Sequence, residues 1–303
     1  MNGQRYLAEI LDSIAEQDFD GDVETLVIDS GSTDDTLAIA ADRVRVHVHR
    51  IPPAEFGHGR TRAFAARLAR APIVAYLTHD ATPASNAWLR ELTAPLLDGR
   101  AEAVVGRQIP RPHAFPLLKY DIRRAFAAQG RGSDVVVRDG TDLSDIALDD
   151  AAFYSDVNAA AFRSILVDVV PYRDVAYSED FVFARDLLRA GFRKAYAPAA
   201  AVVHSNDATV REYRQRMIEE TEGLRRAGFT TPQPGFLGAL AHAAVGALRD
   251  ERSILLDPDY DARETLGWLV INPAYHVARW LGIERGSRVA VSRLDEETPP
   301  DDR

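Results

Sequence analysis

The feature that most constrains this fold is an alternation, over residues 7–106, between amphipathic segments and short apolar runs. Helices are predicted at residues 7–14, from the turn at 32–35 to about residue 41, at 61–69 and at 86–97. Strands are predicted at residues 24–29, 44–48, 73–77 and 103–106. Because strand–helix–strand connections are right-handed, this alternation predicts an α/β fold with a mostly parallel sheet covered by helices. Ligands of such sheets lie beyond the carboxyl ends of the strands.

The rest of the chain is less regular at first and then helical. Residues 129–150 contain several Gly and Asp residues and predict a mobile loop or excursion. A helix is expected to begin at Glu179–Asp180 and to end near Gly191, followed by a pair of strands at 193–197 and 201–204. From Thr209 the chain is mainly helical, with a break at 230–234. We therefore expect an α/β domain at residues 1–230 and a helical C-terminal extension at 231–303, with a frayed acidic tail at 295–303.

Composition excludes several classes of function. None of the 303 residues is cysteine, so disulfides, thiolate nucleophiles and Cys-ligated zinc are ruled out. The net charge is −10, from 36 basic and 46 acidic residues, which disfavours a general nucleic-acid binder. No run approaches the roughly 20 apolar residues of a spanning helix, and the N-terminus has no signal-peptide pattern. We expect a cytoplasmic protein without a nucleic-acid partner.

Acidic residues follow two of the predicted strands and open a later helix. Asp29 ends the strand at 24–29, Asp80 follows the strand at 73–77, and Glu179–Asp180 begin the helix beyond. At strand ends, carboxylates can bind a ribose, hold a divalent cation or deprotonate a hydroxyl. The alternative for Asp29 and Asp34 is that they only cap the next helix. No helix starts directly after Asp80, which favours a functional role there.

A second cluster of candidate residues surrounds the start of the helix at 61–69. The segment at 56–62 contains His58, Arg60, Arg62 and two glycines. Small residues let backbone approach a ligand, and arginines near a helix start suit a pyrophosphate, although an exposed arginine is more often only solvated. The chain has neither a G-x-G-x-x-G motif after its first strand nor a Walker A motif, so dinucleotide binding and ATP hydrolysis lose support.

Eight segments in order resemble one enzyme family. They are NG at 2–3, VIDSGSTD at 27–34, FGHGRTR at 56–62, LTHDA at 77–81, GRQIPRP at 106–112, YSDVN at 154–158, SED at 178–180, and YAP with VHS at 196–198 and 203–205. On these segments the chain resembles the family 2 glycosyltransferases of GT-A fold, in particular the bacterial rhamnosyltransferase-like subgroup. The resemblance covers the chain up to about residue 206. It implies a GT-A nucleotide-binding fold and transfer of a sugar from a nucleotide donor.

The resemblance also implies roles for individual residues. Asp29, with Ser30 beside it, would contact the nucleoside of the donor. Asp80 is the remaining acid of the family's Asp-x-Asp element and would hold the metal and the sugar nucleotide. His204 would either join that metal or be a buried structural histidine. Asp180 would be the catalytic base, with Glu179 orienting the loop or an acceptor hydroxyl. Two further groups complete the expected site: His58 and Arg62 on the donor side, and Tyr154, Asp156 and Asn158 on the acceptor side.

The cofactor expected from this set is a divalent cation, Mg²⁺ or Mn²⁺, since both suit oxygen-rich ligation. Two departures from the family pattern bear on the donor pocket. The family begins with a strand that ends in a Pro-Thr-Tyr-Asn-Gly type of sequence, and this chain starts at Asn2–Gly3, so the first strand is apparently missing. Either that strand lies upstream or part of the donor pocket is lost. Ala63 stands where the subgroup usually has Asn after the arginine, which removes a polar contact.

The predicted function is inverting transfer of a sugar, with dTDP-L-rhamnose as the favoured donor. The acceptor would be a saccharide or a lipid-linked saccharide in cell-surface polysaccharide synthesis. One alternative is a non-catalytic relative that only binds sugar nucleotides, prompted by the missing strand.

The other alternative is a protein of the membrane surface, acting through its C-terminal helices. Those helices carry an apolar stripe over 237–248 and a group of Trp268, Tyr275, Arg279 and Trp280, a combination that suits a lipid interface. The same residues could instead pack on the sheet domain or on a second copy in a homo-oligomer. A lipid-linked acceptor would reconcile the two functions, since it would bring the transferase to the inner face of the membrane.

Overall fold

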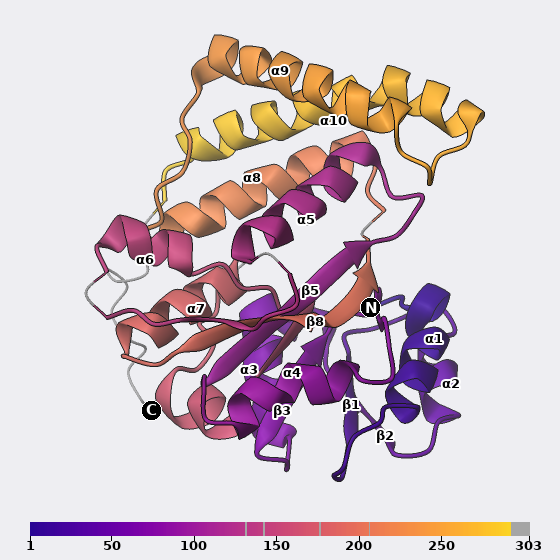
Figure 1. Cartoon of the computed structure of the whole chain (residues 1–303), viewed down its shortest axis with the longest axis vertical. Coiled ribbons are helices and arrows are strands. Elements are labelled where there is room, and N and C mark those ends of the chain that lie inside the picture. Colours follow the sequence, from indigo (N-terminus) through magenta and orange to yellow (C-terminus); the bar gives the residue numbers. More distant parts are fainter. Residues whose placement is uncertain (131, 142, 176, 206, 292–303) are drawn as a thin grey trace. The chain divides into compact units, whose positions relative to one another are not determined.

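The computed structural model of the chain describes residues 1–291, apart from 131, 142, 176 and 206 (Figure 1). The chain divides into two compact units. The first consists of Met1–Pro110, Ile122–Val175 and Glu179–Ser205, and the second of Arg111–Asp121, Ala176–Ser178 and the chain beyond Ser205. The boundary expected at residue 230 thus differs from this division, because the helix that follows residue 209 packs with the C-terminal helices. The tail at 295–303 lies outside the described residues.

The first unit contains every strand of the residues that the structure describes. Its elements through β5 are α1 (Gln4–Ala15), β1 (Thr25–Asp29), α2 (Thr36–Ala41), β2 (Val46–Arg50), a 3₁₀ turn (Pro53–Glu55), α3 (His58–Leu68), β3 (Ile73–Leu77), β4 (Ala81–Pro83), α4 (Trp88–Leu97) and β5 (Ala103–Pro110). The later elements are β6 (Val136–Arg138), α6 (Asp145–Ala151), β7 (Asn158–Phe162), a π-helical turn (Ile165–Val169), α7 (Glu179–Arg189) and β8 (Lys194–His204). The alternation predicted for residues 7–106 is confirmed, with element ends displaced by a few residues.

The sheet arrangement is mixed. A six-stranded sheet has the order β3-β7-β5-β8-β4, and β6 pairs with β8. Only β1·β2 and β5·β8 are parallel among the pairs of the described residues, and the others are antiparallel. The prediction of a mostly parallel sheet is therefore corrected: β4, β6 and β7 enter against the direction of their neighbours, which the local alternation could not reveal. β8 is also one strand, where a pair of strands was predicted.

β1 and β2 form a separate two-stranded sheet within the described chain. Its core consists of Leu7 and Leu11 from α1 and Ala40 from α2, with Val27 and Val48 packed against them. The helical spacing of Leu7 and Leu11 puts both on one face, which explains why α1 lies on this pair of strands.

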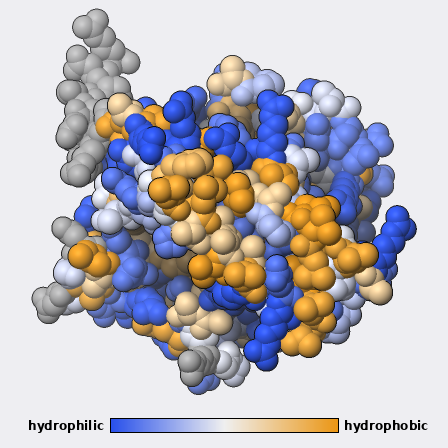
Figure 2. Space-filling model, turned by 90° about the horizontal axis from the view of Figure 1, so that it is seen from above, coloured by the Kyte–Doolittle hydropathy of each residue, from blue (hydrophilic) through white to orange (hydrophobic). Residues whose placement is uncertain are grey.

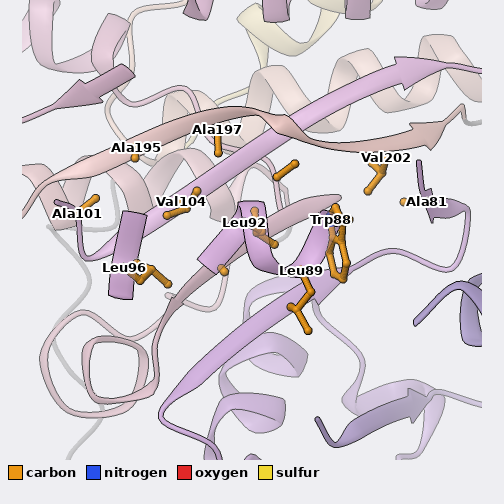
Figure 3. Packing of buried hydrophobic residues seen from close by; sticks show 12 residues of the cluster. Ala81, Trp88, Leu89, Leu92, Leu96, Ala101, Val104, Ala195, Ala197 and Val202 are labelled. Atoms are coloured by element: carbon orange, nitrogen blue, oxygen red, sulfur yellow. The ribbon is translucent and has the colours of Figure 1, made fainter. Parts of the chain in front are cut away.

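The main core lies between α4 and the six-stranded sheet (Figure 3). Trp88, Leu92 and Leu96 of α4 point toward Val104 of β5 and Val202 of β8. All five side chains are at most 2% exposed. The facing strands carry many alanines, so the bulk that fills the layer comes from the helix.

The described residues within 129–150 form regular elements where a loop was predicted. They contain β6 and the start of α6. β6 is held by antiparallel pairing with β8, and Ser144 caps α6 by accepting the N–H of Ala147. Pairing with a strand distant in the sequence was not visible in the local composition.

The second unit is helical. It contains α8 (Val210–Arg226), α9 (Gly235–Leu255), α10 (Ala262–Arg288) and the first turns of α5 (Pro116–Gln129). α10 packs against both α8 and α9. The approach to α8 is close, because a side chain at Gly282 or Gly286 would meet the backbone of α8. Phe115 stacks on Tyr275 at 4.4 Å between ring centroids in the aromatic core of this unit.

Candidate functional site

Strand pairing brings the loops of the site together at one end of the six-stranded sheet, the end at which β3 and β8 terminate. Leu77 at the end of β3 pairs with Asn158 at the start of β7, so the loop after β3 lies beside the loop before β7. Ala81 of β4 pairs with His204 at the end of β8. Asp80, Asp156 and His204, far apart in sequence, are therefore gathered at this end.

Asp29 organises the loop that follows β1. Its carboxylate is 2% exposed and accepts the N–H groups of Gly31 at 3.0 Å and Ser32 at 3.1 Å. Burial opposes ionisation, but hydrogen bonds from Ser32 and Gly31 outweigh it and lower the pKa of Asp29. Gly31 has φ +101°, a conformation that favours glycine. Ser30 is also buried, so the loop forms a turn that is held together by the ionised side chain of Asp29.

The N-terminal residues are bound to the same loop. Asn2 donates its N–H to Ser32 Oγ at 2.8 Å, and Asn2 Oδ1 accepts the N–H of Thr33 at 2.9 Å. Asp34 accepts the N–H of Thr36, the first residue of α2, at 3.1 Å. Asp34 thus has the helix-starting role weighed for it, one residue ahead of the N-cap position.

Asp80 and His204 form a pair at this end of the sheet. Asp80 Oδ2 lies 3.4 Å from His204 Nε2, and Asp80 Oδ1 accepts the hydroxyl of Thr78 at 2.5 Å. Although burial opposes ionisation, His204 and Thr78 lower the pKa of Asp80 to about 2. His204 is buried, and its Nδ1 has no hydrogen-bond partner among the described residues.

This pair is chemically compatible with a divalent cation. A carboxylate that stays ionised is a ligand type of both Mg²⁺ and Mn²⁺, and an imidazole beside it favours Mn²⁺ over the strictly oxygen-ligated Mg²⁺. The described residues contain no cluster of three or more His, Asp or Glu side chains that could hold a metal by themselves. The residues present therefore fit a cation that takes its other ligands from water or from the phosphates of a substrate.

Arg62 lies between two buried carboxylates. Its Nε is 3.0 Å from Asp156 Oδ2, and its Nη1 donates to Glu179. The exposed fractions of the three side chains are 16% for Arg62, 0% for Asp156 and 6% for Glu179. Gly59 lets α3 approach closely, because a Cβ there would lie 2.0 Å from the carbonyl oxygen of Arg173. The guanidinium predicted to face a diphosphate is turned toward carboxylates.

The N-terminus of α7 supplies the acidic pair. Ser178, just before it, is buried and has φ +64°, a strained conformation for a residue with a side chain. Glu179 is 5% exposed, and burial and the neighbouring Asp180 raise its pKa to about 8, against the effect of Arg62. Asp180 is partly exposed and accepts the N–H of Phe181 at 2.9 Å. Burial raises the pKa of Asp180, and the charge of Arg62 together with hydrogen bonds from the backbone of Phe181 and Asp156 opposes this.

The three residues expected on the acceptor side are interior. Tyr154, Asp156 and Asn158 are each at most 1% exposed. Tyr154 donates its hydroxyl to the carbonyl of Ala160, and Asn158 Oδ1 accepts Trp88 Nε1–H at 2.9 Å. Their polar groups bond to the protein, so in this structure none of them lines an open surface.

Two residues of the site were not singled out from the sequence. Tyr172 donates its hydroxyl to Asp156 Oδ1 at 2.6 Å, and Tyr76 donates its hydroxyl to the carbonyl of Arg62 at 3.0 Å. The available signal was weak: a tyrosine within a buried apolar run needs a partner for its hydroxyl. His58 is partly buried at the start of α3, where its ring meets Phe56 edge-on.

Comparison with known proteins agrees with the resemblance. Residues 1–169 match the family described as glycosyl transferase family 2. The chain is 30% identical over 212 residues to the O-antigen chain rhamnosyltransferase RfbN of Salmonella typhimurium, which covers 69% of this chain and 65% of that protein. It is 31% identical over 198 residues to WbaN of Salmonella anatum, another O-antigen chain rhamnosyltransferase, covering 65% of this chain and 61% of that one. The aligned part spans less than two thirds of either relative.

Solved structures show the same architecture. The mannosyltransferase PcManGT from Pyrobaculum calidifontis, in complex with GDP-Man and Mn²⁺, superposes with a TM-score of 0.58 at 19% identity, over 94% of this chain and 83% of that one. The S. aureus TarS fragment with UDP gives 0.51 at 16% identity, over 95% and 88%. These likenesses show a mixed α/β fold of GT-A type. With the family match over more than half of its length, the chain belongs to glycosyl transferase family 2.

Proposed function

We propose that this chain is an inverting glycosyltransferase that transfers rhamnose, with dTDP-L-rhamnose as donor, to a saccharide or lipid-linked acceptor in cell-surface polysaccharide synthesis. The names of the two Salmonella relatives support the sugar and the process. The observation that carries the catalytic part is the partly exposed Asp180 at the N-terminus of α7, beside a Glu179 that is buried against Arg62. Of the two acids, Asp180 is the more accessible to an acceptor.

Asp180 acts as the general base in this proposal. It accepts the proton of the acceptor hydroxyl while that oxygen attacks the anomeric carbon from the face opposite the diphosphate. The raised pKa of Asp180 suits the task, because a more basic carboxylate takes the proton more readily. Glu179 orients the turn around it.

The donor side uses the loops at the strand ends. The rigid turn of Asp29 and Ser30 contacts the nucleoside, and Asp80 with His204 would hold the cation next to the diphosphate. When bound, a divalent cation neutralises charge that develops on the leaving diphosphate. Asp80 is prepared for this role because its pKa of about 2 keeps it ionised throughout the neutral range.

Release of dTDP from dTDP-rhamnose in the presence of Mn²⁺ and acceptor tests the proposal. Asp180→Asn should abolish turnover and leave donor binding largely intact. Asp168→Asn, an exposed acid in the same unit, is the matched control and should behave as the parent. If Asp180→Asn turns over at the parent rate, the base is another residue. If the parent binds dTDP-rhamnose without turnover across acceptors, the chain is a non-catalytic sugar-nucleotide-binding protein.

A second role is favoured by the outer face of α9, which consists of Leu237, Ala241, Ala244, Val245 and Leu248. Leu237 is 79% exposed and Leu248 66%, whereas the side of the helix that packs inward consists mainly of alanine and glycine. An amphipathic helix of a soluble protein ordinarily has the reverse arrangement. Figure 2, viewed from the side on which α9 lies in Figure 1, shows apolar side chains gathered into a patch.

We propose that a lipid surface covers this face. Leu266 and Val270 extend the exposed apolar area onto α10, and the exposed Arg252, Arg263 and Arg285 are available for anionic headgroups. No helix among the described residues has both the length and the apolar character needed to cross a bilayer. Of the group expected to join the interface, Tyr275 is buried and stacks on Phe115 within the second unit, whereas Trp268 and Trp280 are half-buried.

Co-sedimentation with vesicles that contain anionic lipid tests the lipid contact. Leu237→Gln with Leu248→Gln should lower the bound fraction several-fold. A control with equally exposed aliphatics removed from the first unit, Val44→Gln with Ile146→Gln, should bind as the parent. Equal binding by both variants would refute the assignment, as would a parent that stays unbound. A parent that instead self-associates in sedimentation velocity, with the α9 variant monomeric, would assign the face to a homo-oligomer.

A further inference from the structure

The site contains three carboxylates and one guanidinium in a buried space. Asp156, in the turn before β7, and Glu179, at the start of α7, both contact Arg62. Asp180 lies next to Glu179 on α7 and receives hydrogen bonds from the backbone of Phe181 and Asp156. If all three acids were ionised, the cluster would carry two uncompensated negative charges in a site that is largely shielded from water, which is costly.

Three charged groups act on the pKa of Glu179, and each belongs to a different segment of the first unit. Arg62 is on α3, Asp156 is in the turn before β7, and Asp180 is on the helix of Glu179 itself. Tyr172 donates its hydroxyl to Asp156 Oδ1, whereas Arg62 contacts the other oxygen, Oδ2. Arg60 is near in sequence to Arg62 but is exposed and paired with Asp174, so it does not compensate the cluster.

Resting on the proposed role of Asp180 as the base, we propose that Glu179 is a neutral positioning residue that holds the spare proton of this cluster, and that Asp156 is the counter-ion of Arg62. In this arrangement Arg62 binds Asp156 and Glu179, beside the proposed base, and does not contact the diphosphate of the donor. Two features distinguish the acids in this arrangement. Asp156 has both a guanidinium and a tyrosine hydroxyl as partners, and Asp180 has backbone N–H groups and partial access to water.

The electrostatics of the site agree with this assignment. Burial raises the pKa of Glu179 to about 8 and that of Asp156 to about 6, with Arg62 lowering both. At neutral pH Glu179 is therefore protonated and Asp156 is mainly ionised. During turnover the proton of the acceptor hydroxyl passes to Asp180 and later to water, and Glu179 retains its own proton throughout.

The pH dependence of unfolding tests the proton on Glu179 without any need for activity. A carboxyl that stays protonated to about pH 8 in the folded chain but ionises near pH 4.5 when unfolded destabilises the fold as pH rises between these values. The effect approaches tenfold in the unfolding constant per pH unit. Glu179→Gln, which imitates the protonated acid, removes this dependence. The ratio of parent to variant unfolding constants should therefore rise at least tenfold from pH 5 to pH 8.

Glu102→Gln is the matched control. Glu102 pairs with Arg193 and has a lowered pKa, so its contribution is already complete at pH 5 and the same ratio should stay flat or move slightly the other way. A ratio for Glu179→Gln that is constant within twofold would overturn the proposal. If Glu179→Gln does not fold, Asp156→Asn serves: removing that negative charge lets Arg62 lower the pKa of Glu179 further, which moves the pH dependence to lower pH.

The pH dependence of kcat tests whether Glu179 acts by positioning Asp180. Above about pH 8 the parent acquires a negative charge on Glu179 beside Asp180, whereas Glu179→Gln does not. The ratio of kcat for Glu179→Gln to kcat for the parent should rise between pH 7 and pH 9. A ratio independent of pH, together with a flat stability ratio, refutes the assignment. A chain without transferase activity but with the predicted stability ratio refutes only the proposed function.

Discussion

Replacing Arg62 by methionine is the most informative perturbation of the site. Methionine keeps much of the length of the side chain and removes the guanidinium, so Asp156 and Glu179 lose the cation that they share. Arg60→Met is the internal control: its ion pair with Asp174 has both side chains more than half exposed. The two variants remove the same charge from neighbouring positions of α3 in opposite environments.

The expected loss in the free energy of unfolding depends on how deeply each ion pair is buried. Removing one partner of a buried pair costs about 3–5 kcal/mol, because the remaining charge stays out of water, and Asp156 has a fully buried side chain. An exposed pair contributes about 0–1 kcal/mol. Arg62→Met should therefore lower the free energy of unfolding by about 3–5 kcal/mol at pH 8. Arg60→Met should lower it by less than about 1 kcal/mol.

The sign of the pH dependence separates charge from packing. Without Arg62 the pKa of Asp156 rises above its present value of about 6, because Arg62 now lowers it. At pH 5 both acids are then neutral, and the loss shrinks to the roughly 1–3 kcal/mol of an unsatisfied buried group.

Urea unfolding at pH 5 and pH 8, followed by far-ultraviolet circular dichroism, measures the difference. An equal loss at both values would show that Arg62 acts through packing, and a loss below about 1 kcal/mol at pH 8 would refute the buried ion pair.

Three other changes test particular contacts. Asn158→Ala leaves the Trp88 indole N–H and two backbone carbonyls without their partner. It should lower the free energy of unfolding, measured by urea titration, by about 2–4 kcal/mol, which is more than the effect of an Asn→Ala change at an exposed position. Gly59→Ala places a Cβ 2.0 Å from the Arg173 carbonyl oxygen, so α3 must shift; the melting temperature should fall by several degrees, and an unchanged value would contradict the close approach. Asp80→Asn should raise the Mn²⁺ concentration needed for half-maximal dTDP release at least tenfold, and removal of Mn²⁺ by a chelator should stop the parent; an unaltered Mn²⁺ requirement would exclude Asp80 as a ligand.

Local pattern was sufficient for the elements and for several residues of the site. The spacing of Leu7 and Leu11 predicted α1, and the apolar run at 73–77 is β3. Asp29 and Asp80 were recognised because each stands at the end of a strand: Asp29 is the last residue of β1, and Asp80 lies between β3 and β4. These inferences succeeded because helical and strand periodicity are encoded within a few neighbouring residues.

Strand direction and burial were beyond local pattern. Whether β7 runs parallel or antiparallel to β5 depends on how a long connection returns, and β6 is a strand only because β8 offers it an edge. For the same reason the interior position of Tyr154 and Asn158 did not follow from their place beside a motif.

The sequence by itself determined which chemical groups this protein has available: a cysteine-free, acidic chain with carboxylates after its strands and an acidic pair at a helix start. Only the tertiary structure decided how those groups are charged. Folding removes Asp156, Glu179 and Arg62 from water and sets three acids around one guanidinium, and the pKa of each acid depends on that burial and on its neighbours. Such interactions act over a few ångströms between residues more than a hundred positions apart, as between Arg62 and Glu179, so no local pattern contains them.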